Sequence, residues 1–357
     1  MDPARLQQRK TVVIVDDSPL LRRWLRVVLE GNRRLVVVGE ASDAQEARAV
    51  IKATRPDVIT LDIEMPGMNG LVFLEKLMRL NPLPVVVFSG VTRDNCETTV
   101  RALMLGAVDC LKKPENGTNQ RLRDNISRRV FSAACSRLQL APRPRVANAS
   151  VPAVRHQGHE PILLIGASTG GVAALDTLLG GLDPAGPPVV IVQHMPGIYL
   201  VSFSQLLDRR FDQDVLLARP GMVLAPGQIV LAPALGQHTA LVRRRGQWET
   251  RLHADEEGAK HCPSIDQLFH SAVPYARDVI ATILTGLGQD GARGLKALRD
   301  AGATTFGQDK DSSTVYGMPR AAWDIGAVER QYPLAEMPQA INQAAAKHRA
   351  RLVRTRQ

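Results

Sequence analysis

Hydrophobic positions along the chain form two series, in which short β-branched or aliphatic runs alternate with longer patterns of helical period. In the first series, the segments that contain expected strands are 11–17, 35–42, 57–67, 83–90 and 107–114. In the second series they are 161–168, 188–194, 228–234, 238–244 and 278–286. Strands that alternate with helices form parallel sheets covered on both faces. The pattern therefore predicts an α/β fold with two doubly wound parallel-sheet domains.

A stretch with little periodicity separates the two series and contains Pro142, Pro144 and Pro152, a composition typical of a linker. The length of 357 residues suits two domains. We place the first domain at residues 9–127, the linker at 128–159, the second domain at 160–347 and a basic tail at 348–357.

The net charge of +10 resembles that of a nucleic-acid binder, but the basic residues gather around the linker and in the tail, and aromatic residues are only 4%. We therefore expect no nucleic-acid partner. No apolar run is long enough to span a bilayer, so we expect no membrane insertion. The four cysteines are scattered and form no C-x-x-C pair, which fits a reducing cytoplasm and no structural metal.

Acidic and polar residues follow the expected strands of the first domain. Asp16 and Asp17 follow the first strand, and Asp62, Ser89 and Lys113 end the third, fourth and fifth. The carboxyl ends of parallel strands meet at one edge of the sheet, so these side chains should converge. Converging carboxylates repel each other unless a hard cation lies among them, and Mg²⁺ with a phosphoryl group suits such a site.

The same residues carry a family resemblance. The segments "VDDSPLLRRWL", "DVITLDIEMPGMNGL", "VVVFSG" and "GAVDCLKKP" resemble the flavodoxin-like receiver domain of two-component response regulators over residues 10 to about 125. The resemblance implies that Asp62 accepts a phosphoryl group from a histidine kinase, that Asp16 and Asp17 help Asp62 to hold Mg²⁺, and that Ser89 and Lys113 contact the phosphoryl group. Cys110 stands where the family usually has an aromatic switch residue, so ring rotation cannot be the signal here.

A glycine-rich turn opens the second domain, where "PILLIGASTGG" leads from an expected strand into an expected helix. Three interpretations fit this turn. It is a plain tight turn, an anion-binding helix start, or a G-x-S-x-G elbow that presents Ser168 as a nucleophile. The turn alone does not distinguish them.

A nucleophilic serine needs a general base and an orienting carboxylate. His194 ends the strand that follows the Ser168 unit, so sheet geometry places it at the same edge. Asp290 lies in a glycine-rich loop between a strand and a helix, where capping that helix is the commonest role of an aspartate. We set aside His238, which begins a strand and so belongs to the opposite edge, and His253 and His261, which lie in polar stretches.

The surrounding motifs resolve the choice by resemblance. "GASTGG", "VVIVQHMP", "SIDQLFHSA", "ILTGLGQDGARGL" and "VYGMPRAA" resemble the Rossmann-like catalytic domain of the chemotaxis protein-glutamate methylesterases over residues 161–345. The resemblance implies that Ser168 is the nucleophile, His194 the base and Asp290 the orienting carboxylate of a phosphorylation-regulated hydrolase. It also implies demethylation of chemoreceptor glutamates, deamidation of receptor glutamines, no cofactor in this domain, and Thr169 or Gly170 as oxyanion donors.

Two local departures from the family affect the expected substrate groove. After His194 the segment "GIYLVSF" puts Tyr199 at the family's aromatic position and Leu200 at a threonine position, and the loop "APALGQH" is also unusual. The main alternative function is a receiver-linked adaptor that binds receptors without catalysis. A dinucleotide binder would have glycine in place of Ser168, and a DNA-binding regulator would have a helix-turn-helix after the linker.

Overall fold

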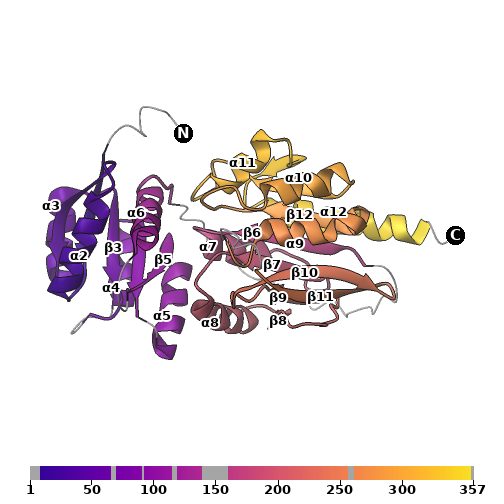
Figure 1. Ribbon diagram of the computed structural model, residues 1–357, viewed down its shortest axis with the longest axis horizontal. Coiled ribbons are helices and arrows are strands. Elements are labelled where there is room, and N and C mark those ends of the chain that lie inside the picture. Colours follow the sequence, from indigo (N-terminus) through magenta and orange to yellow (C-terminus); the bar gives the residue numbers. More distant parts are fainter. Residues whose placement is uncertain are drawn as a thin grey trace. The chain divides into compact units, whose positions relative to one another are not determined.

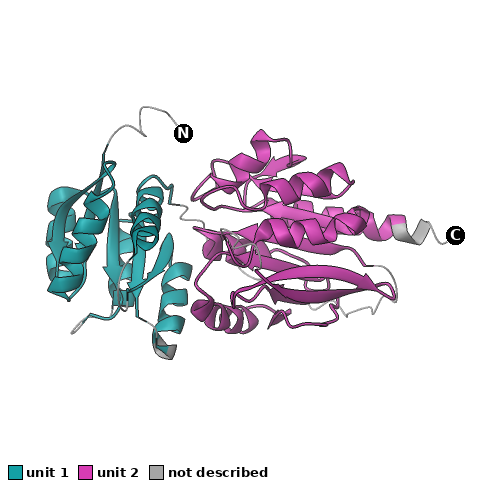
Figure 2. Cartoon of the chain, viewed as in Figure 1, with its two compact units in different colours: residues 1–140 teal, residues 141–357 magenta. Residues whose placement is uncertain are grey.

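Figure 1 shows a computed structural model of the chain, in which residues 9–65, 70–90, 92–114, 119–138, 160–255 and 261–354 are described. The chain divides into two compact units, Met1–Leu140 and Ala141–Gln357 (Figure 2). Most of the expected linker lies outside the described residues.

The first unit is an alternation of strands and helices around one five-stranded parallel sheet. Its elements are β1 (Lys10–Val15), α2 (Pro19–Glu30), β2 (Leu35–Ala41), α3 (Ala44–Thr54), β3 (Val58–Asp62), α4 (Gly70–Leu80), β4 (Val85–Ser89), α5 (Arg93–Met104), β5 (Asp109–Lys112) and α6 (Gln120–Ala134). The strand order β2-β1-β3-β4-β5 is the flavodoxin-like arrangement. Strands β3 and β4 are buried throughout, as expected of strands covered on both faces.

Helix α6 passes the point where we expected the linker to begin. It starts behind the N-cap Asn119, whose side chain accepts the Leu122 N–H at 2.9 Å, and it continues to Ala134. Val130 and Phe131 belong to the core of the first unit. The helix therefore crosses the boundary that we placed at residue 127 and continues to bury apolar side chains beyond it.

The second unit contains a seven-stranded parallel sheet. Its elements are β6 (Ile162–Ala167), α7 (Gly171–Leu179), β7 (Val189–Gln193), α8 (Gly197–Asp208), β8 (Asp214–Leu217), β9 (Gln228–Leu231), β10 (Gln237–Arg244), β11 (Gln247–Ala254), α9 (Ile265–Ala272), the 3₁₀ helix η1 (Val273–Asp278), β12 (Val279–Ile283), α10 (Ala292–Asp300), β13 (Thr304–Gln308), α11 (Met318–Asp324), β14 (Arg330–Tyr332) and α12 (Met337–Arg354). The order is β14-β13-β12-β6-β7-β9-β8, which places β6 between β12 and β7.

Strand β10 does not join this sheet, although the segment 238–244 reads as one more strand of the alternating series. It pairs antiparallel with β11 in a separate hairpin (Figure 1). The two residues of the turn, Arg245 and Gly246, both have positive φ, at 50° and 81°. Such a turn matches the twist of paired strands, and it returns the chain before a helix can form a parallel crossover.

Helix α12 extends through the segment we predicted to be a separate tail. It runs to Arg354, and His348 lies 3.1 Å from the Thr304 hydroxyl, from ring Nε2 to Oγ1. The basic residues of this segment are thus largely helical. Among the helices that the structure describes, none combines the length and the apolar character that a bilayer crossing requires.

Candidate active site and phosphoacceptor site

The three residues of the expected triad lie at the carboxyl ends of three adjacent strands. Ser168 directly follows β6, His194 directly follows β7, and Asp290 lies in the loop after β12. The registers Ala167↔Gln193 and Ile283↔Gly166 place these strand ends side by side. The His194 N–H also donates to the Ala167 carbonyl at 2.9 Å, which extends the pairing to the site itself.

The turn at Ser168 is closed by backbone hydrogen bonds. The Ser168 N–H donates to the Thr285 carbonyl at 3.0 Å, and the Gly171 N–H donates to the Ser168 carbonyl at 2.7 Å. Gly170 has a φ of 77°, and a Cβ there would meet the Thr314 side chain at 2.6 Å. Only glycine fits this position, which is the residue directly before α7.

Gln193 supports this turn and was not identified from the sequence. Its side chain is buried, and Nε2 donates to the Ser168 carbonyl at 2.9 Å and to the His194 carbonyl at 3.1 Å. A Cβ at Gly171 would lie 2.2 Å from Gln193 Oε1. The second glycine of "TGG" therefore makes room for the glutamine, a reason that the motif alone could not reveal.

His194 and Asp290 form a hydrogen-bonded pair, with Nε2 of the ring 2.9 Å from Asp290 Oδ2. Both side chains are mostly shielded from solvent, with exposed fractions of 11% and 10%. Among the described residues, Nδ1 of the same ring is buried and has no hydrogen-bond partner. Because an ionised carboxylate accepts the Nε2 proton, the neutral ring has an unprotonated Nδ1, which suits a general base.

Asp290 caps a helix, but not the one that follows it in the sequence. Its carboxylate accepts the N–H groups of Ile265 at 2.8 Å and Asp266 at 3.1 Å, in the first turn of α9, and the Ser264 hydroxyl at 2.9 Å. Helix α10 has Gly291 as its N-cap, without a side-chain hydrogen bond. The expected capping role is thus partly correct, because Asp290 is a cap and also the partner of His194.

These contacts control the charge of Asp290. Burial raises its pKa, but the hydrogen bond and charge of His194, together with the backbone N–H groups of Ile265 and Asp266, outweigh burial and hold the pKa well below the usual range. The carboxylate is therefore ionised at every pH at which the protein is expected to work.

His261 belongs to the site, although we had set it aside. Its ring stacks on that of His194, with centroids 4.4 Å apart and planes 10° apart. Nothing in the polar stretch before α9 indicates this contact, because the contact arises from the tertiary fold and not from a local sequence pattern.

The acidic site of the first unit also forms as the strand ends predict. Asp16 and Asp62 are each 1% exposed, and Lys113 Nζ donates to Asp62 Oδ2 at 2.6 Å and lies 3.4 Å from Asp16 Oδ2. Burial lowers the pKa of Lys113, but the hydrogen bond and charge of Asp62 raise it by more. The lysine is thus held as a cation beside the predicted phosphoacceptor.

The donor set fits Mg²⁺. Carboxylate oxygens of Asp16, Asp17 and Asp62 lie within 4.8 Å of one another. Burial and the charge of Asp62 raise the pKa of Asp16 despite the opposing charge of Lys113. Asp16 Oδ2 is buried and, in the part of the chain that the structure describes, has the Lys113 ion pair at 3.4 Å but no hydrogen bond of good geometry. A buried carboxylate oxygen that accepts no hydrogen bond, among other oxygen ligands, is what a hard cation would satisfy.

Ser89 and Cys110 lie where the sequence predicts. Ser89 ends β4 with 1% exposure, and its hydroxyl donates to the Gly90 carbonyl at 3.2 Å. Cys110 is buried in β5 opposite Val87, and burial raises the pKa of its thiol to about 12. A small, neutral, enclosed side chain thus occupies the position where a rotating aromatic ring would otherwise stand.

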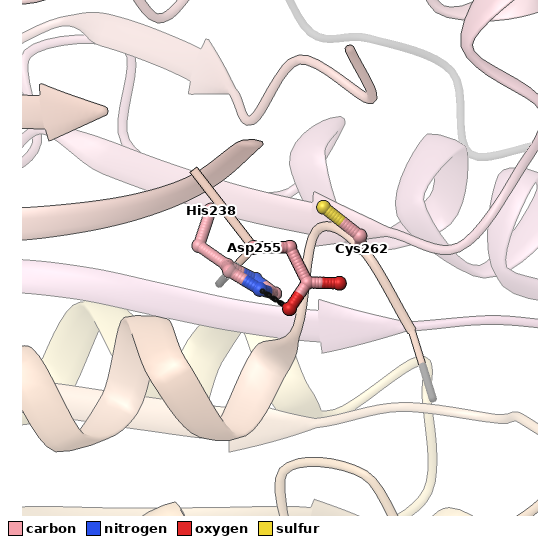
Figure 3. Close-up of side chains that lie close together, drawn as sticks. All are labelled: His238, Asp255 and Cys262. Atoms are coloured by element: carbon pink, nitrogen blue, oxygen red, sulfur yellow. Dashed lines mark ion pairs between the residues drawn. The ribbon is translucent and has the colours of Figure 1, made fainter. Parts of the chain in front are cut away.

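A second cluster with metal-binding residue types lies near α9 and contains His238, Asp255 and Cys262 (Figure 3). Its hydrogen bonds argue against a metal. The Ser264 N–H donates to Nδ1 of His238 at 3.0 Å, so the ring proton is on Nε2, which faces Asp255 Oδ1 at 3.3 Å. A metal at Nε2 would have to replace that proton, so the residues do not fit a cation.

The first departure from the family, at Tyr199 and Leu200 after His194, is internal. Tyr199 is 0% and Leu200 1% exposed, both within α8. The side chains therefore pack inside the unit instead of lining an open groove. Leu235, in the unusual loop before β10, is by contrast 75% exposed.

Comparison with known proteins gives one consistent result for the two units. A family model described as the response regulator receiver domain matches residues 12–127, and one described as CheB methylesterase matches residues 163–341. Among solved structures, the Thermotoga maritima CheB methylesterase catalytic domain is similar with a TM-score of 0.50 and 30% identity, covering 52% of this chain and 98% of that one.

Two relatives match across both units of this chain. The chain is 44% identical over 344 residues to the protein-glutamate methylesterase/protein-glutamine glutaminase 1 of Caulobacter vibrioides, covering 95% of this chain and 98% of that protein. It is 43% identical over 335 residues to the corresponding protein of Agrobacterium fabrum, covering 92% and 95%. With both units matched in order, the chain belongs to the CheB methylesterase family and carries a response regulator receiver domain ahead of its methylesterase domain.

Proposed function

We propose that the second unit hydrolyses the methyl esters of glutamate side chains in chemoreceptors, with Ser168 as nucleophile, and that it also deamidates receptor glutamines. The observation that carries this proposal is the His194–Asp290 pair, which leaves the buried Nδ1 of His194 without a hydrogen-bond partner among the described residues, next to the Ser168 turn. The names of the relatives supply the substrate class.

In the proposed reaction His194 Nδ1 takes the Ser168 hydroxyl proton as Oγ attacks the ester carbonyl. The imidazolium that forms is stabilised by the ionised carboxylate of Asp290 through Nε2. His194 then gives its proton to the departing methanol, and water hydrolyses the glutamyl-serine ester by the same route. For a glutamine substrate the proton goes to ammonia, so the same residues serve both reactions.

The developing oxyanion needs N–H donors near the start of α7. The N–H of Ser168 already donates to Thr285, and that of Gly171 to the Ser168 carbonyl, so neither is available without breaking the turn. Thr169 and Gly170 lie between them, at the positive end of the helix dipole. We keep these two residues as the proposed donors.

Control by phosphorylation is the proposed role of the first unit. A histidine kinase would transfer a phosphoryl group to Asp62, with Lys113 and Ser89 as contacts. Mg²⁺ held by Asp16, Asp17 and Asp62 would supply positive charge to the phosphoryl oxygens. The proline-containing segment between the units suggests that the phosphorylated receiver changes access to Ser168.

The test is methanol release from methylated cytoplasmic fragments of chemoreceptors by the full-length protein. We expect Ser168→Ala to lower the rate at least about 1000-fold, because the nucleophile is removed. Ser42→Ala, in the first unit, is the matched control and should keep the wild-type rate. If the wild type releases no methanol while receptor binding persists, the chain is the receiver-linked adaptor instead. Normal release by Ser168→Ala would mean that Ser168 is not the nucleophile.

A further inference from the structure

His238 lies outside the proposed catalytic groups but is tied to them by hydrogen bonds. It is the second residue of β10, with 2% exposure, and its ring contacts Asp255 after β11 and Ser264 before α9. On one side Nε2 faces Asp255, directly after β11, at 3.3 Å. On the other side Nδ1 accepts the N–H of Ser264, the N-cap of α9, at 3.0 Å (Figure 3 shows the Asp255 side).

The segment 261–264 touches the His194–Asp290 pair at two points. Ser264 donates its hydroxyl to Asp290 Oδ1 at 2.9 Å, and His261 stacks its ring on that of His194 at 4.4 Å. Ser264 is thus held by its N–H on His238 and holds Asp290 by its hydroxyl. A displacement of this segment would move two groups together. One is the Ser264 hydroxyl, which donates to Asp290, and the other is the His261 ring, which covers one face of the His194 ring.

We propose that His238 is a positioning residue for the esterase reaction, and that its Nδ1 acceptor fixes the segment 261–264 against His194 and Asp290. This inference rests on the function proposed above for Ser168, His194 and Asp290. It assigns the β10–β11 hairpin, which lies outside the parallel sheet, a part in aligning the general base.

Two amide substitutions separate the two polar contacts of His238, the hydrogen bond from Ser264 and the ion pair with Asp255. In His238→Asn the side-chain oxygen can occupy the place of Nδ1 and accept the Ser264 N–H, while the contact with Asp255 is lost. In His238→Gln the amide reaches the place of Nε2 and can donate to Asp255, while the Ser264 N–H loses its acceptor. Both variants remove the buried ring, so their packing losses are similar.

We expect His238→Gln to lower kcat for methanol release roughly 10-fold to 100-fold with little change in KM, because a small misplacement of catalytic groups has effects of this size. His238→Asn should keep most of the wild-type kcat. His253→Gln is the control, because this exposed histidine lies in the same hairpin, with its ring centroid 5.3 Å from that of His238. Its kcat should equal that of the wild type.

A second readout does not depend on turnover. The proton on Nε2 of His194, which bonds to Asp290, should give a distinct NMR signal in the wild type and in His238→Asn, and a shifted or broadened one in His238→Gln. If the wild type releases no methanol, the proposed function fails, and the NMR comparison still tests the positioning role.

Two outcomes would overturn the inference. If the Asn and Gln variants lose melting temperature but keep the wild-type kcat and the His194 signal, His238 only stabilises the hairpin. If His238→Gln is the more active of the two, the contact with Asp255 matters and the bond to Ser264 does not.

Discussion

Asp16 and Asp290 are both largely shielded carboxylates that follow strands of a parallel sheet, yet their environments act in opposite directions. At Asp16, burial and a second carboxylate outweigh the single ammonium of Lys113, and the pKa rises. At Asp290, four donors surround the carboxylate, and the pKa falls. The first site is thus short of positive charge, as expected of a cation site, whereas the second is complete with protein groups alone.

The largest effect should come from removing the charge of Asp290. We expect Asp290→Asn to lower kcat on the order of 1000-fold to 10000-fold, because a neutral amide cannot stabilise the imidazolium or select the ring proton on Nε2. The assay is methanol release. Asp300→Asn, which changes an exposed carboxylate paired with Lys296, should keep the wild-type rate. A loss below about tenfold for Asp290→Asn would mean that the pair has no catalytic part.

A second variant isolates the phosphoacceptor. With a small phosphodonor and Mg²⁺ present, we expect the rate of Asp62→Asn to match that of the wild type without the phosphodonor, because the amide cannot form an acyl phosphate. Phosphoprotein analysis of the same samples should find the label only in the wild type. Stimulation that survives in Asp62→Asn would show that control does not pass through this residue.

The smallest effect tests the charge imbalance at Asp16. Because its pKa is raised on folding, the ionised group destabilises the folded first unit above the unfolded pKa, and this cost disappears as the pH falls. Asp16→Asn should therefore raise the free energy of unfolding at neutral pH without Mg²⁺. The variant should also lose the stabilisation that Mg²⁺ gives the wild type.

Denaturant titrations with EDTA and with Mg²⁺ measure both quantities. A wild type that Mg²⁺ does not stabilise, or an Asn variant that is less stable without the ion, would contradict the interpretation of this cluster as a cation site.

The sequence predicts those features that follow from the pattern of a single strand and from the residues at its end. The two parallel sheets follow from the alternating pattern, and the positions of Ser168, His194 and Asp62 follow from strand ends. From the sequence alone, capping a helix was the commonest role for Asp290, and only the family resemblance favoured a catalytic role. The structure shows that it caps α9, whose first residue lies 25 positions earlier.

Residues that meet through tertiary packing were not predictable in this way. Gln193 is the last residue of a buried strand, and its contact with the Ser168 carbonyl depends on the register between β6 and β7. His238 was assigned to the wrong sheet, because a strand of the alternating series and a strand of a hairpin have the same pattern. His261 reaches His194 through a segment whose Ser264 is bonded to the hairpin and to Asp290, contacts that no local pattern indicates.

The central claim is that His194 activates Ser168, and a fluorophosphonate reagent, which labels activated serines, tests it directly. We predict that mass spectrometry of the labelled full-length protein finds the adduct on Ser168, that methanol release falls in proportion to labelling, and that His194→Ala is not labelled. Labelling of a different residue, or full methanol release after complete modification of Ser168, would contradict the account.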